Sequence, residues 1–204
     1  MTVTNAATGR RICVVGDALV AGVGDPKALG WVGRVAARTP TEVPPIAVFP
    51  LGVPGESTAG LLGRWRQETA LRFADGADNR LVVAPGHADL AAGLSTARSR
   101  LNLANVLDDA ESRGVPAFVV GPAPTLDQAL NPRIGELAEA FADVSQRRRV
   151  PFVDCFAPLV GHDQWYSDLA GGDGVHPGQS GYGLVAWLVL HGGWHEWLGV
   201  PRDQ

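Results

Sequence analysis

The sequence predicts a doubly wound α/β domain: a three-layer sandwich in which helices cover both faces of a five-stranded parallel sheet. Short apolar runs rich in β-branched residues alternate with longer segments of helical periodicity. The runs lack the in/out alternation of a sheet that faces water, so both faces of each strand are expected to be covered. We expect residues 1–204 to form a single domain, with an N-terminal tail at 1–10 and no internal repeat.

Five apolar runs are the expected strands, and each leads into a loop marked by glycine, proline or a polar residue. They are Arg11–Val15, Ile46–Phe49, Leu81–Ala84, Ala117–Val120 and Phe152–Val153. In an open parallel sheet a ligand binds beyond the carboxyl ends of the strands. The residues directly after each run are therefore the ones expected to form a site.

The segments between the runs repeat apolar residues at helical spacing and are the expected helices. They are Gly30–Arg38, Thr58–Phe73, Ser95–Arg113, Asn131–Arg148 and Ser180–Leu198. Ser57 stands directly before the second of these helices. We expect it to be the N-cap, because a serine oxygen accepts hydrogen bonds from first-turn amides.

Composition excludes several classes of protein. The net charge of -4 and the pI of about 5.7 argue against a partner with a phosphate backbone, so no nucleic acid is expected to bind. The basic cluster Arg147, Arg148 and Arg149 is short and is interpreted as a solvated helix end. The scarcity of lysine beside arginine suggests a bacterial source.

The sequence also predicts the compartment. Cys13 and Cys155 lie in apolar, strand-like segments and are expected to be buried free thiols. The first residues lack a basic segment followed by an apolar run, and no apolar stretch approaches the roughly 20 residues that span a bilayer. We therefore expect a soluble, cytoplasmic protein without a membrane partner.

Four loops carry the residues of chemical interest. They read Gly16-Asp17-Ala18-Leu19, then 51–57, then Gly86-His87-Ala88-Asp89, and finally Asp173-Gly174-Val175-His176. Taken in order, they resemble the conserved sequence blocks of the SGNH (GDSL) hydrolase family of esterases, lipases and acyltransferases. The resemblance covers nearly the whole chain and implies the flavodoxin-like form of the predicted sandwich.

In that family the first block supplies a serine nucleophile, and a backbone N–H of the second and an asparagine of the third form the oxyanion hole. The last block supplies a histidine base and the aspartate that orients it. Carried over by position, Gly52, Asp173 and His176 match. Ala18 stands at the serine position and Ala88 at the asparagine position.

This departure changes the expected chemistry. Serine-type acyl transfer needs an oxygen that loses its proton to the histidine, and alanine has none. Loss of one oxyanion donor typically costs roughly 2.7–4 kcal/mol of transition-state stabilisation. The backbone N–H groups at Ala18 and Gly52 would remain. The chain is therefore not expected to be a competent serine esterase.

Three interpretations stay open. In the first, His176 and Asp173 are retained as a general acid/base for non-hydrolytic chemistry on an ester or acyl-type substrate: cyclisation, isomerisation or dehydration. In the second, the chain is an engineered, inactive variant of an esterase or acyltransferase. In the third, it is a pseudoenzyme that only binds an acyl ligand. The first is preferred, because a single substitution usually suffices to disable an enzyme on purpose, whereas here both residue 18 and residue 88 are alanine.

Further residues are assigned by position. Asp17, His87, Trp165 and Tyr166 are candidate substrate-binding residues, although support of the turn, a surface loop and helix packing are competing interpretations. The expected partner is a small acyl or ester-like ligand, with no cofactor and no metal. The sequence does not predict an oligomeric state.

The other histidines are interpreted without a functional role. His162 is expected to be solvated in its turn. His191 and His195 are spaced for one helical face, but the sequence lacks the second histidine of a zinc motif, so both are expected at the surface. Asp89 is expected at a helix start without a catalytic part.

Overall fold

The computed structural model describes residues 9–40 and 45–201 and contains one five-stranded parallel sheet. The strand order is β2-β1-β3-β4-β5, which is the flavodoxin-like order. The strands are β1 (Arg10–Gly16), β2 (Ile46–Gly52), β3 (Asp78–Ala84), β4 (Ala117–Val120) and β5 (Phe152–Val153). The predicted fold class and all five predicted strands are confirmed.

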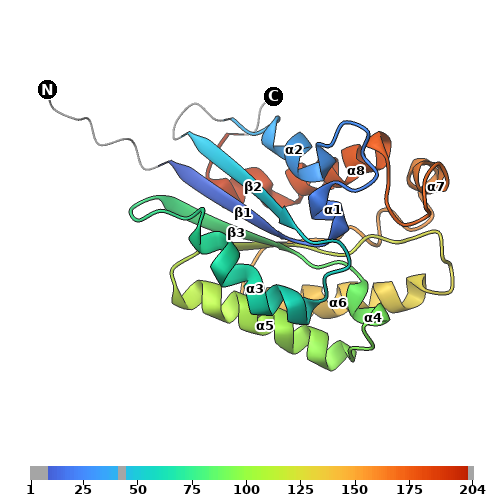
Figure 1. Cartoon of the computed structure of the whole chain (residues 1–204), viewed down its shortest axis with the longest axis horizontal. Helices are drawn as coiled ribbons and strands as arrows, with labels where there is room; N and C mark the ends of the chain where they lie inside the picture. Colours follow the sequence, from blue (N-terminus) through green and yellow to red (C-terminus); the bar gives the residue numbers. More distant parts are fainter. Residues whose placement is uncertain (1–8, 41–44, 202–204) are drawn as a thin grey trace, which may run out of the picture.

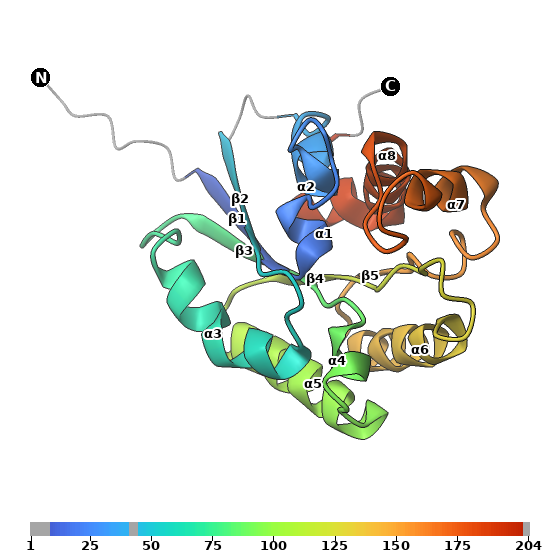
Figure 2. The same ribbon diagram turned by 45° about the vertical axis from the view of Figure 1, so that its right-hand side comes forward.

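Helices form the two outer layers of the sandwich (Figures 1 and 2). One face of the sheet carries α1 (Ala18–Ala21), α2 (Gly30–Ala36), α7 (Asp163–Ala170), α8 (Gln179–Val189) and α9 (His195–Leu198). The other face carries α3 (Thr58–Ala70), α5 (Thr96–Ser112) and α6 (Asn131–Arg147), with the short α4 (Ala88–Ala91) following β3. The sheet is therefore covered on both sides, as its apolar strands predicted.

Each central strand contributes to two separate cores, because successive side chains point to opposite faces. Ile12 and Val14 pack in a cluster with the helices of the α2 and α8 layer. Val15, one position further on, packs in the cluster of the α3, α5 and α6 layer. The three side chains are fully buried, so β1 is fixed in the middle of the molecule, with its carboxyl end at the candidate site.

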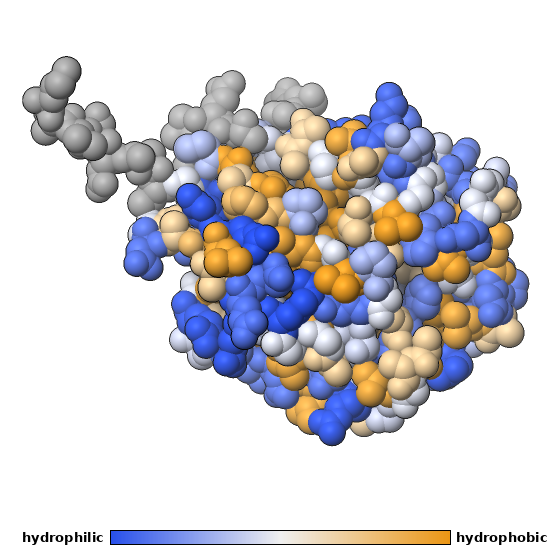
Figure 3. Space-filling model, viewed as in Figure 1, coloured by the Kyte–Doolittle hydropathy of each residue, from blue (hydrophilic) through white to orange (hydrophobic). Residues whose placement is uncertain are grey.

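The edge strand β2 differs from its neighbours, since its residues are only partly buried. It runs three residues beyond the expected end at Phe49 and includes Pro50. An edge strand tolerates proline, because its outer side needs no N–H donor. Figure 3 shows apolar residues along this edge, above the more hydrophilic surface of α3.

The first described residues belong to the sheet rather than to a tail. The predicted tail at 1–10 lies outside the described residues over 1–8, and at Arg10 it is wrong, because Arg10 begins β1 and pairs with β2 and β3. Arg10 Nε also donates to Asp78 at 2.7 Å, which anchors the strand start.

The last predicted helix is interrupted. After α8 the chain passes through a π-helical turn, Leu190–Trp194, in which Gly192 and Gly193 depart from helical geometry. A Cβ on Gly192 would lie 2.7 Å from a methyl of Val153, so the close approach to β5 requires glycine. Gly193 has a φ of 98°, in the left-handed region. The short helices α1 and α7 were not predicted; of α4 only a helix start at Asp89 was expected, and Asp89 lies in its first turn.

Cys13 and Cys155 are buried free thiols, as predicted. Burial raises the pKa of Cys13 to about 12, and it also raises that of Cys155. Over residues 9–40 and 45–201, no helix combines the length and hydrophobicity needed to cross a bilayer.

Candidate active site

The register of the sheet brings three of the predicted loops to one place. Gly16, the last residue of β1, is level with Gly52 at the end of β2 and with Ala84 at the end of β3. The loops that follow these residues therefore start side by side at the carboxyl edge. The strand order reverses between β1 and β3. In open parallel sheets, ligands bind at such a reversal, beyond the carboxyl ends of the strands.

The first loop presents Ala18 as the first residue of α1. Asp17 is the N-cap: its Oδ1 accepts a hydrogen bond from the backbone N–H of Leu19 at 3.0 Å. Because the first amides of a helix have no intrahelical acceptor, the N–H of Ala18 remains a potential donor. The Ala18 side chain is only 5% exposed and ends in a methyl group, so it offers no hydroxyl.

Asp17 is a buried carboxyl group. Its burial raises its pKa to about 6, although the Leu19 hydrogen bond and the nearby His176 act in the opposite direction. Glu56, from the loop after β2, contributes further to the rise. Asp17 stabilises the turn that leads into Ala18, which agrees with the interpretation that its role is to support this turn.

His176 and Asp173 form a hydrogen-bonded pair. Nδ1 of His176 lies 2.6 Å from Oδ2 of Asp173. The other oxygen, Oδ1, accepts the backbone N–H groups of Val175 at 2.9 Å and His176 at 2.8 Å. These bonds stabilise the ionised carboxylate and lower the pKa of Asp173 well below its usual range. The pair is formed as the sequence predicted.

Several contacts place this pair beside the loops after β1 and β3. His176 interacts electrostatically with Asp17, and it also lowers the pKa of His87, whose burial acts in the same direction. A Cβ on Gly24 would lie 3.2 Å from Cβ of His176, so the segment after α1 packs directly on the histidine loop. That segment is tied to α1 by the hydrogen bond from Val23 N to Ala18 O at 3.1 Å.

The structure also contains hollows near the pair. One of about 500 Å³ is lined by Asp173 and His176 together with Gly24, Ser167 and Gln179, among others. Ala18, Gly52 and Ala88 are not among its lining residues. A much smaller hollow of about 20 Å³ lies against Asp17, beneath the first loop. The large hollow therefore reaches the pair from the side of α7 and α8.

Residues 14–184 match the model of the GDSL-like lipase/acylhydrolase family. The chain belongs to this family. Esterase TesA of Pseudomonas aeruginosa is 26% identical over 175 residues, which cover 85% of this chain and 83% of that protein.

Solved structures show the same GDSL fold. The lipase/acylhydrolase from Enterococcus faecalis superposes with a TM-score of 0.74 at 23% identity, covering 96% of this chain and 99% of that one. The acetylxylan esterase Axe2 from Geobacillus stearothermophilus gives a TM-score of 0.76 at 17% identity, with coverages of 96% and 99%. The esterase-type hydrolase fold is thus established for this chain.

Within this GDSL fold, the glycine of the second loop has a packing role. A Cβ on Gly52 would lie 2.3 Å from the backbone nitrogen of Ala21 and 2.5 Å from the carbonyl oxygen of Asp17, so only glycine lets β2 approach α1 so closely. Gly55, further along, has a φ of 74° and open space around it.

The third GDSL loop is held by Asp89, which is 1% exposed. Its carboxylate accepts hydrogen bonds from N and Oγ1 of Thr58, at 2.6 and 2.7 Å. Asn102 donates to the same hydroxyl at 3.0 Å. Asp89 therefore fastens α4 to the start of α3, which agrees with a structural and non-catalytic role. Ala88 is the first residue of α4.

Trp165 is not available as a substrate-binding residue, and that expectation is wrong. It is fully buried, and its indole nitrogen donates to the carbonyl oxygen of Pro124 at 3.0 Å. Tyr166 is half-buried, receives a hydrogen bond from Asn131 Nδ2 at 3.2 Å, and packs against the core. Neither residue lines the hollow beside His176.

The other histidines differ from one another. His195 is buried, so the prediction of a surface position is wrong there, whereas His191 is exposed and stacks on Trp187 at 4.2 Å. His162 is half-buried, and its Nδ1 accepts the Trp165 N–H as the N-cap of α7, so it is not simply solvated. In the described part of the chain, no group of three potential metal ligands gathers.

Arg64 of α3 holds two site loops and was missed by the sequence analysis. Its Nη2 donates to the carbonyl oxygen of Leu51 at 2.7 Å and to Glu56 Oε2 at 2.6 Å, with a longer bond of 3.4 Å to Gly16 O. These contacts join the ends of β1 and β2 to the loop carrying Gly55. An arginine on a helix gives no sequence signal of such a role.

Proposed function

We propose that this GDSL-family protein does not hydrolyse esters through a serine nucleophile, and that His176 and Asp173 act as a general acid/base on an acyl-type substrate. The reaction class is proton transfer in a cyclisation, isomerisation or dehydration. One observation carries the proposal: the His176–Asp173 pair is held at 2.6 Å beside a loop whose nucleophile position is a methyl group.

The pair has what proton transfer requires. An ionised Asp173 accepts the Nδ1 proton of His176, which leaves Nε2 as the atom that can take a proton from a substrate. Because three hydrogen bonds hold Asp173, the imidazole is fixed in orientation before any ligand binds. Such positioned acid/base groups typically contribute rate factors of about 10²–10⁴.

Candidate replacement nucleophiles are engaged elsewhere. Ser57 is the N-cap of α3, and its Oγ accepts the Gly60 N–H at 3.3 Å. Cys13 lies inside β1, where burial raises the pKa of its thiol to about 12 and so disfavours the thiolate. These observations support chemistry that needs no covalent intermediate.

The proposed step is the transfer of a proton from the substrate to His176 and back. Nε2 of His176 removes a proton from the carbon next to the substrate carbonyl. The electron pair of the broken C–H bond forms a double bond to the carbonyl carbon, and the π electron pair of the C=O bond passes to the carbonyl oxygen. Backbone N–H groups of Ala18 and of the loop with Gly52 and Gly55 are the proposed donors to that oxygen. The proton then returns to the product from His176, at the same or another carbon.

The test follows this proton without requiring the natural substrate. The N-acetylcysteamine thioester of butyric acid is incubated with the protein in D₂O, and exchange of its α-protons is followed by NMR. We expect exchange above the buffer rate, reduced about 10²–10⁴-fold by His176→Ala. His191→Ala, an exposed histidine on α8's continuation, is the matched control and should leave exchange unchanged.

The outcomes separate the interpretations. Exchange that does not depend on His176 contradicts the acid/base role. Binding of the thioester without exchange contradicts it as well and favours a ligand-binding protein. Release of free thiol at the same rate as exchange would restore hydrolysis as the activity.

A further inference from the structure

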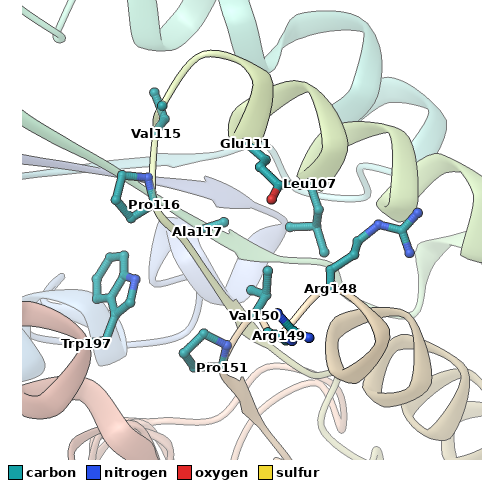
Figure 4. A pocket seen from close by; sticks show the side chains of 11 residues that line it. Leu107, Glu111, Val115, Pro116, Ala117, Arg148, Arg149, Val150, Pro151 and Trp197 are labelled. Carbon is teal, nitrogen blue, oxygen red and sulfur yellow. The ribbon is translucent and has the colours of Figure 1, made fainter.

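A third hollow, of about 490 Å³, lies at the opposite end of the sheet from the candidate active site. Figure 4 shows its lining, which comes from α5, the segment before β4, the segment before β5, and α9. Val115 and Pro116 precede β4, and Val150 and Pro151 precede β5. These are the amino ends of the strands, whereas His176 and Ala18 lie at the carboxyl edge. A ligand here would not touch the His176–Asp173 pair.

Trp197 forms one wall and carries an unsatisfied donor. Its Nε1 is buried and has no hydrogen-bond partner among the described residues. In Figure 4 the nitrogen-bearing edge of the ring faces the hollow. The ring is held from behind by Phe118 and Trp194, with centroids at 5.1 and 5.3 Å, and by Arg80 at 5.2 Å. The donor is therefore held in place without an acceptor, and a ligand reaches it by displacing the atoms that cover it.

Two arginines and one carboxylate, that of Glu111, lie on the opposite side of the hollow. Arg148 is already engaged, because its Nε and Nη2 bind Asp108 at 2.6 and 2.8 Å. Arg149 is exposed and forms no ion pair with residues 9–40 or 45–201. Its φ of 55° is left-handed, a conformation that follows the end of α6 and places this residue at the rim. Arg149 thus agrees with the expected solvated helix end, and it is the arginine of the cluster that can pair with a ligand.

We propose that this hollow binds an elongated amphipathic carboxylate with a carbonyl group along its length, such as an N-acyl amino acid. The carboxylate pairs with Arg149, the carbonyl oxygen accepts the Trp197 N–H, and the acyl chain lies against Val150, Pro151 and Leu107. The volume falls in the range of about 300–1,000 Å³ that is typical of small-molecule sites. The proposal is independent of the chemistry at His176.

The test uses N-octanoylglycine as the probe and N-propyloctanamide as its uncharged match. Binding is measured by calorimetry, and the Trp197 indole signal is followed by ¹H–¹⁵N NMR, assigned by its loss in Trp197→Phe. We expect saturable binding of N-octanoylglycine that shifts this signal. Arg149→Asn should weaken binding about three- to tenfold, because a rim charge is lost and asparagine accepts the left-handed backbone. The amide should bind more weakly and be insensitive to that change.

Matched variants locate the site. Arg147→Gln removes the same charge two residues away, outside the hollow, and His176→Ala alters the other edge; both should leave binding unchanged. Trp197→Phe should weaken it a few-fold, as expected for one neutral hydrogen bond. An unshifted Trp197 signal, equal weakening by Arg147→Gln, or equal affinity for the uncharged amide would overturn the proposal.

Discussion

The carboxylate of Asp17 packs directly on the Cα of Gly86: a methyl group added at residue 86 would lie 1.7 Å from Oδ2 of Asp17. Asp17 follows β1 and Gly86 follows β3, so this contact joins two loops of the candidate site. It fixes the position from which Ala18 begins α1 and from which His87 leads into α4.

Gly86→Ala is therefore expected to destabilise the protein. The methyl group cannot be placed without moving a buried carboxylate, and overpacking of this kind typically costs about 1–3 kcal/mol. Thermal or urea unfolding measures the loss. Gly63→Ala is the matched control: residue 63 is an exposed position in α3 with free space, and alanine there should stabilise by roughly 0.5–1 kcal/mol. Equal stability of the two variants would show that the Asp17 contact is not tight.

Asp17→Asn is expected to stabilise the protein at high pH only. Burial raises the pKa of Asp17 to about 6 in the folded chain, whereas an unfolded aspartate titrates near 3.9. As the pH rises, the unfolded state therefore loses this proton before the folded state does. The free energy of unfolding falls as a result between about pH 4 and pH 6. Asparagine stays neutral and can still accept the Leu19 N–H.

Thermal unfolding at two pH values measures this effect. At pH 8 the variant should unfold with a free energy higher by on the order of 3 kcal/mol, and at pH 4 most of this difference should be gone. Asp163→Asn, an exposed aspartate in the first turn of α7, should show the same small change at both values. A pH-independent effect of Asp17→Asn would argue against a raised pKa.

Thr58→Val tests the attachment of the third loop. The change removes the hydroxyl that donates to Asp89 and accepts from Asn102, so two buried polar groups each lose a partner. Unfolding should become easier by about 1–3 kcal/mol. Thr96→Val provides the comparison, because Thr96 is also the first residue of a helix capped by serine but is exposed. A matching loss in both variants would reduce the effect to helix capping.

Ala18→Ser with Ala88→Asn tests the lineage of the site. The parent chain should show no burst with p-nitrophenyl acetate, since no side-chain oxygen stands at residue 18. The double variant should give an acyl-enzyme burst, and Ala18→Ser alone should turn over about 10²–10³-fold more slowly because it lacks one oxyanion donor. Adding His176→Ala should remove the burst. A double variant without any burst would mean that the loops no longer align for hydrolysis.

Much of the fold was predictable from local pattern. The continuous apolar runs of β1, β3 and β4 mark strands that are buried on both faces, and Ser57 caps α3 as its residue type predicts. The helix α1 escaped prediction because it has four residues, too few to show a helical period, and of the equally short α4 only the start near Asp89 was expected. The break at Gly192 depends on Val153, a residue far away in the chain.

The sequence by itself determined that Ala18 and Ala88 carry no catalytic side chain, and that Asp173 and His176 stand three residues apart in one loop. Only the tertiary structure decided what surrounds them. The raised pKa of Asp17, the burial of Trp165 and His195, the hold of Arg64 on two loops, and the unpartnered indole of Trp197 all depend on elements distant in the chain. Desolvation and close contact are properties of the packed molecule, so no local pattern encodes them.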